Sequence, residues 1–236
     1  MTNNFELFRE YIKKAGIPDS KNYLNDKFFL VELIRRGKDC PNLPAANYTF
    51  KIYYVDSIEE YDRAREEIEI LCKNFPLRAY ISVNCKSKIK SLKKTLVKIA
   101  SAIDMNESKK PWRLFNTSCN EIENKEDKRW VVDIDTKSQY TIDLIKNIIQ
   151  ECESKYNKND IFIETVNTKS GIHLITRPFN TYQFDKKIEE INKNRQEAFK
   201  SIDDNYIDLI DLTIEKPEVK KNHLTLLYED LDSQKS

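Results

Sequence analysis

The chain has 236 residues, enough for one large or two small domains with a substantial core. Its 40 Lys and Arg residues nearly balance its 39 Asp and Glu residues; the net charge of +1 excludes a globally basic protein and leaves only a local basic surface for nucleic acid. No apolar run or signal-peptide core predicts a membrane partner. Five scattered cysteines exclude a disulfide framework or a zinc cluster. We therefore expect a reduced, cytoplasmic protein (host cytoplasm if viral).

The first half of the chain predicts helices that alternate with strands. Spaced apolar residues predict a helix at residues 5–15, whereas residues 28–36 fit either a strand or a short helix. The capping box Ser57-Ile58-Glu59-Glu60 opens a helix that reaches Asn74. Two predicted strands, at 48–55 and 77–84, flank this helix.

A lysine-rich segment at residues 87–103 predicts a further helix with a basic exposed side. We expect its apolar residues to pack inward: Ile89, Leu92, Leu96 and Ile99. The candidate contacts to a single-stranded nucleic acid are three of its lysines and two residues of the preceding strand: Lys90, Lys93, Lys94, Arg78 and Tyr80. The alternative is a solvated helix face without a ligand. Residues 106–128 predict an irregular polar loop.

The second half of the chain repeats the alternation and ends in strands. We predict strands at 130–135, 160–166, 172–176, 206–212 and 223–228, with helices at 138–154 and 184–199. The order predicts an α/β (α+β) fold, in which an N-terminal βαβα unit is joined to a split βαβ sheet. The predicted division is a helical or irregular segment at 1–46 and one domain at 47–236, with an αβ unit at 47–105 and the second sheet at 129–230.

The most informative pattern is a pair of aspartates on the strand at 130–135. Alternate side chains of a strand share one face, so Asp133 and Asp135 are expected on the same side. Neighbouring carboxylates repel unless a cation lies between them, and Mg²⁺ or Mn²⁺ is the usual one. His173 follows Gly171 on a second apolar strand, so the pattern predicts a metal-assisted phosphoryl- or nucleotidyl-transfer site. A solvated strand edge and a structural histidine are the ordinary alternatives.

These motifs resemble those of the archaeo-eukaryotic primase (primase–polymerase) superfamily. Val132-Asp133-Ile134-Asp135 is similar to its hydrophobic-Asp-hydrophobic-Asp motif, and Ser170-Gly171-Ile172-His173 to its Ser-Gly-x-His motif. A third motif, an apolar residue before an aspartate, fits both Asp208 and Asp211; we favour Asp208 because it lies in mid-strand. The resemblance covers residues 48–228, and the segments at 78–84 and 224–228 look like those of small phage-encoded primase-like proteins. The zinc-binding element of classical primases has no counterpart here.

The resemblance implies an N-terminal αβ unit joined to a catalytic sheet of RNA-recognition-motif (RRM) type. It further implies a DNA primase or primase–polymerase that makes or extends primers on a single-stranded template in phage DNA replication or repair. Asp133, Asp135 and Asp208 would hold Mg²⁺ or Mn²⁺, and His173 would contact the phosphates of an NTP or dNTP.

Three further residues near this histidine are candidates for nucleotide binding: Lys169, Ser170 and Lys221. A helicase or other replication protein is an expected partner. Two alternatives use the same residues differently: a metal-dependent nuclease, and a catalytically inactive module that binds nucleic acid or protein.

Overall fold

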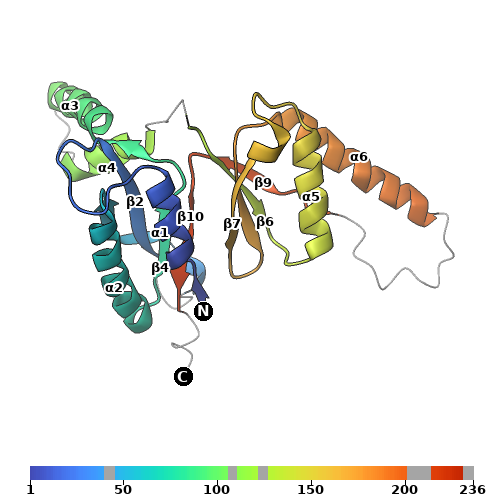
Figure 1. Ribbon diagram of the computed structural model, residues 1–236, viewed down its shortest axis with the longest axis horizontal. Coiled ribbons are helices and arrows are strands. Elements are labelled where there is room, and N and C mark those ends of the chain that lie inside the picture. Colours follow the sequence, from blue (N-terminus) through green and yellow to red (C-terminus); the bar gives the residue numbers. More distant parts are fainter. Residues whose placement is uncertain (40–45, 106–110, 122–126, 201–213, 231–236) are drawn as a thin grey trace. The chain divides into compact units, whose positions relative to one another are not determined.

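The computed structural model describes residues 1–39, 46–105, 111–121, 127–200 and 214–230 (Figure 1). The chain forms two compact units: the first combines Met1–Lys128 with the chain from Asn222 onward, and the second is Arg129–Lys221. The described residues form antiparallel sheets and six α-helices, which confirms the predicted mixed α and β class. None of the described helices is long and apolar enough to cross a membrane.

The first unit is built on a sheet in which every neighbouring pair of strands is antiparallel. Its order is β1 (Thr2–Asn3), β10 (Leu224–Glu229), β4 (Arg78–Ser82), β2 (Lys27–Arg35) and β3 (Tyr48–Val55), with β5 (Lys86–Ser87) paired to the start of β2. The helix α2 (Ile58–Asn74) connects β3 to β4, and β2 lies between those two strands. Short 3₁₀ turns occur at Gly37–Asp39 in this unit and at Lys158–Asp160 in the second.

The undecided segment at 28–36 is the strand β2. Its residues are buried on both faces, so it lacks the alternation that marks a strand with one solvated face. The predicted boundary at 46/47 is wrong, because it separates β2 from β3, its hydrogen-bonded neighbour. The predicted extent of the second sheet, 129–230, is also wrong at its end: β10 pairs with β1 and β4 in the first unit.

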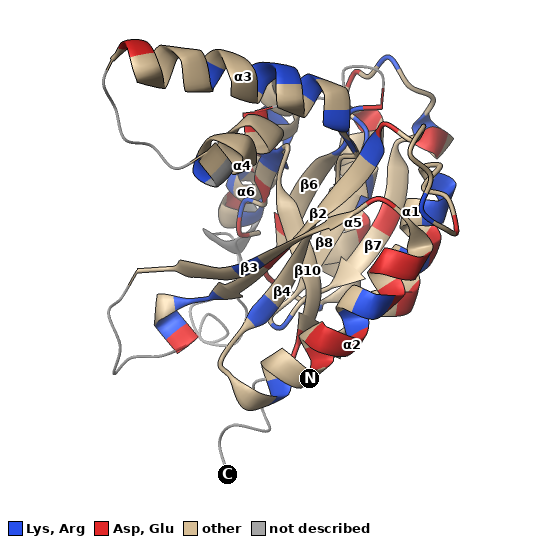
Figure 2. Ribbon diagram, turned by 90° about the vertical axis from the view of Figure 1, so that its left-hand side faces the viewer, with Lys and Arg blue, Asp and Glu red and all other residues tan. Residues whose placement is uncertain are grey.

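Helices cover both faces of the first sheet (Figure 2). On one face, α1 (Phe5–Lys14) and α2 pack through aromatic side chains; for example, Tyr11 contacts Phe29 of β2. The predicted helix start at Ser57 is confirmed, since the Glu60 amide donates to the Ser57 hydroxyl at 3.2 Å, while the Glu60 carboxylate accepts from the Asp56 amide at 3.4 Å. On the other face, Cys119 of α4 (Pro111–Glu121) packs with alternate residues of β2.

The helix at 87–103 exists as α3 (Lys88–Asp104), but the prediction of its inward face is wrong. The side chains it buries are small: Ser91, Thr95 and Ala102. Leu96, in contrast, is 66% exposed. The reason is α4, which lies where a polar loop was predicted, covers the sheet and supplies the surface against which α3 packs.

The second unit has the element order β6, α5, β7, β8, α6, β9. Their bounds are Trp130–Ile134, Gln139–Glu151, Phe162–Asn167, Ile172–Thr176, Thr181–Lys200 and Glu218–Lys221. The sheet order is β7-β8-β6-β9, with every pair antiparallel. Its core joins Val132 and Ile134 of β6 to the apolar sides of both helices. The strand predicted at 206–212 lies outside the described residues.

Candidate functional site

Three side chains from adjacent strands of the second unit meet at the carboxylate of Asp133. Asp133 and His173 are direct cross-strand partners on β6 and β8, and the imidazole Nε2 lies 3.1 Å from Oδ1. From the other side, Lys220 of β9 donates to Oδ2 at 2.6 Å. The Nζ of Lys220 is also 3.1 Å from the carboxylate of Glu218. The site is thus a carboxylate held between two nitrogen donors.

The alternation of β6 explains why Asp133 projects toward these groups. Val132 and Ile134 are buried in the core of the second unit. The residue between them must therefore point to the opposite face of the sheet. Directly opposed residues of antiparallel strands share a face, so the register also brings His173 and Glu218 to this side.

The electrostatics of the site favour the charged forms of both members of the Asp133–Lys220 pair. Half-burial alone would raise the pKa of Asp133, but the hydrogen bonds and charges of His173 and Lys220 outweigh it and hold that pKa well below its ordinary value. Burial also disfavours the ammonium of Lys220, yet its hydrogen bonds to Asp133 and Glu218 raise its pKa. Lys220 therefore balances the charge of Asp133.

The turn before β8 brings the second predicted aspartate into a defined contact. The hydroxyl of Ser170 donates to Oδ1 of Asp135 at 3.2 Å. The turn itself is closed by two hydrogen bonds between Thr168 and Gly171: the Gly171 amide donates to the Thr168 hydroxyl at 3.1 Å, and the Thr168 amide donates to the Gly171 carbonyl at 3.0 Å. Lys169 is exposed in the same turn. Both sequence motifs therefore meet, through one contact at Asp133 and another at Asp135.

The two aspartates supply the hard oxygen donors that Mg²⁺ and Mn²⁺ prefer. Asp133 already uses both oxygens, whereas Asp135 is exposed. Within the described ranges, no group of three His, Cys, Asp or Glu side chains could hold a metal ion. The predicted third acid, Asp208, and its alternative, Asp211, both lie outside the described residues. Among the described residues, Asp133 and Asp135 are therefore two oxygen donors that do not by themselves form a metal site.

The lysine at the site is Lys220 rather than the predicted Lys221. Successive residues of β9 point to opposite faces, and the Nζ of Lys221 lies 5.0 Å from the centre of the Trp130 ring instead. Sequence reasoning missed this choice because the segment Glu218-Val219-Lys220-Lys221 is short and polar and did not predict a strand. The one apolar residue of this segment, Val219, packs on the core and was the only sign in the sequence that the segment could be a strand.

The residues predicted to contact nucleic acid have different environments in the first unit. Arg78 is buried, and its guanidinium lies 2.6 Å from Asp39 and 3.1 Å from Glu229, so the prediction that it projects toward a template is wrong. The Tyr80 hydroxyl accepts a hydrogen bond from Arg36 at 3.2 Å.

The predicted basic side of α3 has fewer unpaired charges than the sequence suggests. Lys94 lies 2.8 Å from Glu121 of α4, so its charge is already balanced. Lys90 and Lys93 are exposed, and neither has an ion pair within the described residues.

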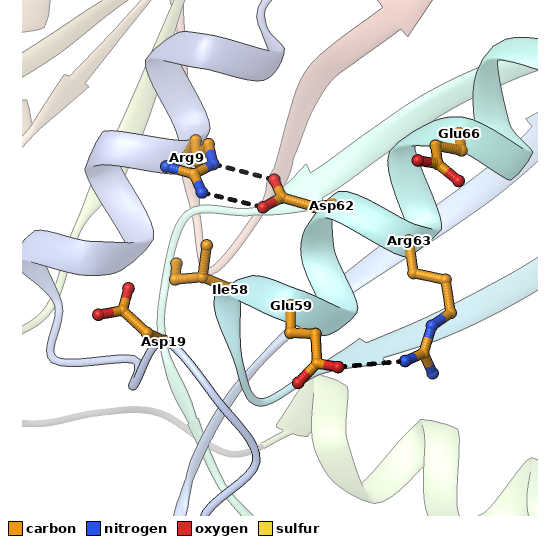
Figure 3. A pocket seen from close by; sticks show the side chains of 7 residues that line it. All are labelled: Arg9, Asp19, Ile58, Glu59, Asp62, Arg63 and Glu66. Atoms are coloured by element: carbon orange, nitrogen blue, oxygen red, sulfur yellow. Dashed lines mark hydrogen bonds and ion pairs between the residues drawn. The ribbon is translucent and has the colours of Figure 1, made fainter.

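A hollow of about 450 Å³ between α1 and α2 is lined by several charged groups (Figure 3). Four of its six charged residues already pair with one another. Arg9 makes two hydrogen bonds of 2.9 Å to Asp62, and Arg63 lies 3.6 Å from Glu59. The hollow shares no residue with the Asp133 site, and its paired charges give no reason to prefer it as a functional site.

Comparison with models of protein families, with curated protein sequences and with solved structures found no match to this chain.

Proposed function

We propose that the second unit carries the active site of a metal-dependent nucleotidyltransferase of the primase–polymerase type. It would make or extend a primer on a single-stranded template from NTPs or dNTPs. The observation that carries the proposal is the meeting of Asp133, His173 and Lys220 on three adjacent strands. Carboxylates and nitrogen donors side by side suit a ligand that combines a cation with phosphate oxygens.

The topology of the second unit also supports the proposal. Its βαββαβ order and its sheet order, β7-β8-β6-β9, agree with a split βαβ fold, the kind of sheet that the resemblance leads us to expect. The first unit would be the N-terminal αβ unit of the same family. Since many functions share this fold, the residues at Asp133, and not the fold, support the proposed activity.

In the proposed reaction, the oxygen of a primer 3′-hydroxyl forms a bond to the α-phosphorus of the nucleotide. The bond from that phosphorus to the bridging oxygen of the β-phosphate breaks, so that pyrophosphate leaves, and the hydroxyl proton passes to solvent water. Asp133 and Asp135 would hold the metal, which supplies charge neutralisation at the phosphates and lowers the pKa of the hydroxyl. His173 and Lys220 would donate to phosphate oxygens, since each already binds an oxyanion at Asp133. Ser170 would orient Asp135 through its hydroxyl.

The direct test is primer extension with labelled oligonucleotide, single-stranded template, nucleotides and Mg²⁺ or Mn²⁺. Asp133→Asn should reduce incorporation by at least about 100-fold, because loss of a residue that only supports a metal ligand already costs about 10- to 100-fold and Asp133 would bind the metal itself. The matched control is Asp143→Asn, which changes an exposed carboxylate on α5 and should leave incorporation unchanged. Incorporation that survives in Asp133→Asn would remove the basis of the proposal.

The same reaction mixture separates the proposal from its two alternatives. A nuclease would shorten the labelled strand in the presence of metal, with or without nucleotides. An inactive binding module would leave the strand unchanged. Calorimetry would then show no metal binding that is lost in Asp133→Asn. Either result would contradict a nucleotidyltransferase.

A further inference from the structure

The helix α3 in the first unit presents a continuous apolar stripe to solvent. The stripe consists of Ile89, Leu92, Leu96, Ile99 and Ile103, at alternating spacings of three and four residues. Four of these side chains are 55% to 69% exposed, and Ile99 is partly buried. Large apolar side chains gathered on one exposed surface are unusual in a soluble domain and commonly mark an interaction site.

The way α3 packs explains why the stripe is left uncovered. Its buried side is formed by Ser91, Thr95 and Ala102, which are small enough to let α4 approach closely. The Ser91 hydroxyl donates to the carbonyl of Ser87, the N-cap of α3, and the Thr95 hydroxyl donates to the carbonyl of Ser91, each at 2.7 Å, so burial leaves neither unsatisfied. The apolar stripe lies beside this small-residue face. The small-residue side of α3 therefore packs against α4, and the apolar stripe beside it faces solvent.

The geometry of the stripe selects a helical occupant. Spacing of three and four residues keeps the stripe narrow and parallel to the helix axis, as the a and d positions of a coiled coil do. A helix that lies in a membrane surface has a broader apolar face, which contacts lipid along its whole width. A narrow seam instead suits side chains that interlock with those of one other helix.

The charges beside the stripe indicate the chemistry of that helix. Lys88, Lys94 and Lys98 have acidic partners within the first unit, namely Asp56 for the first and Glu121 for the other two. Lys93 follows the stripe residue Leu92 and flanks the stripe, and it is exposed without an ion pair among the described residues. Lys90 is also exposed, but it lies on the side of α3 away from the stripe. Figure 2 shows these positive charges concentrated in the N-terminal half of α3.

We propose that α3 is a docking surface for an amphipathic, acidic helix of a different protein. Such a helix would place apolar residues against the stripe and Asp or Glu against Lys93. A second copy of the chain fits less well, because the only acidic residue of α3 is Asp104 at its end, so another α3 offers no Asp or Glu to Lys93. This inference is independent of the nucleotidyltransferase site, which lies on the second unit.

The probe is a fluorescently labelled three-heptad peptide with Leu or Ile at a and d and Glu at e and g. Its matched partner carries Lys in place of Glu. The full-length protein should bind the acidic peptide and discriminate against the basic one, and added salt should weaken the complex. Fluorescence anisotropy measures both effects.

The chain offers a closely matched pair of variants for this assay. Leu96 lies in the stripe and Val97 beside it, and the two are 66% and 67% exposed. Leu96→Gln should weaken peptide binding by at least about 10-fold, the expected cost of removing a central anchor, whereas Val97→Gln should change it by less than about 2-fold. Because both positions are on the surface, circular dichroism should show unchanged folding for both.

Three outcomes would overturn the proposal. The first is equal binding of the acidic and basic peptides, or no binding of either. The second is association with anionic phospholipid vesicles, abolished by Leu96→Gln, in a protein that does not bind the acidic peptide. That result would assign the stripe to a lipid surface. The third is a dimer that Leu96→Gln dissociates in sedimentation experiments, which would assign the stripe to a second copy.

Discussion

Gly171 lies so close to Ile134 that the two positions leave no room for a side chain between β8 and β6. A Cβ on Gly171 would lie 1.9 Å from the carbonyl oxygen of Ile134 and 2.7 Å from the amide nitrogen of Thr136. These obstacles are backbone atoms, so a change of rotamer cannot relieve the clash. The close approach holds the turn that carries Ser170 against the segment that carries Asp135.

Gly171→Ala should therefore lower the free energy of unfolding by about 1–3 kcal/mol, as overpacking does elsewhere, because the two strands must move apart. Urea denaturation measures the change. Ser170→Ala is the control: it removes only an exposed contact and should cost less than about 0.5 kcal/mol. A Gly171→Ala protein with unaltered stability would mean that the backbone relaxes freely at this point.

Lys220 and Lys221 provide a test of which lysine serves the proposed nucleotide site. Lys220→Met removes the ammonium that binds Asp133, whereas Lys221→Met removes a charge that contacts the Trp130 ring. We expect Lys220→Met to weaken nucleotide triphosphate binding by at least about 10-fold, the effect of losing one charge-assisted hydrogen bond, and Lys221→Met to have little effect. Calorimetric titration with a nonhydrolysable nucleotide distinguishes them. The opposite order would restore Lys221 as the binding residue.

Arg78 is expected to contribute to stability rather than to template binding. Arg78→Met would leave the carboxylates of Asp39 and Glu229 buried without their common cation. The free energy of unfolding should fall by about 3–5 kcal/mol, the usual cost of breaking a buried ion pair. The control Arg63→Met changes an exposed guanidinium, 3.6 Å from Glu59, and should cost less than about 1 kcal/mol. Similar values for the two variants would contradict a structural role for Arg78.

Glu32 should make the stability of the first unit depend on pH. Burial raises its pKa, although a hydrogen bond from Asn120 and the charge of Lys86 oppose this shift. A carboxyl group with a raised pKa binds its proton more tightly in the folded state. Its contribution to stability is therefore complete below the unfolded pKa and is lost as the pH rises through the folded pKa.

Glu32→Gln lacks this titration and keeps an oxygen that can accept from Asn120. Its free energy of unfolding, relative to that of the natural chain, should increase as the pH rises from about 4, near the ordinary pKa of Glu, to neutrality. Urea denaturation across that range measures the difference. A difference that does not change with pH would show that Glu32 titrates alike in the folded and unfolded chain.

Local patterns in the sequence were sufficient where a feature depends on near neighbours along the chain. The capping box at Ser57 predicted the start of α2, since its hydrogen bonds span only three residues. Alternation predicted β6 with Asp133 facing away from the core, and the motif around His173 predicted the strand beside it. The expectation that both motifs belong to one site followed from these strands. The role of that site stays a prediction.

Other features were decided only when distant segments packed together. The strand β2 resembled a helix as much as a strand because helices cover both of its faces and bury it. The register of β9, and not its composition, placed Lys220 on Asp133 and turned Lys221 away. Similarly, the spacing of α3 identified an apolar stripe, but the position of α4 determined that small residues would be buried and the stripe exposed. Periodicity defines the faces of an element, whereas contacts between elements determine which face meets solvent.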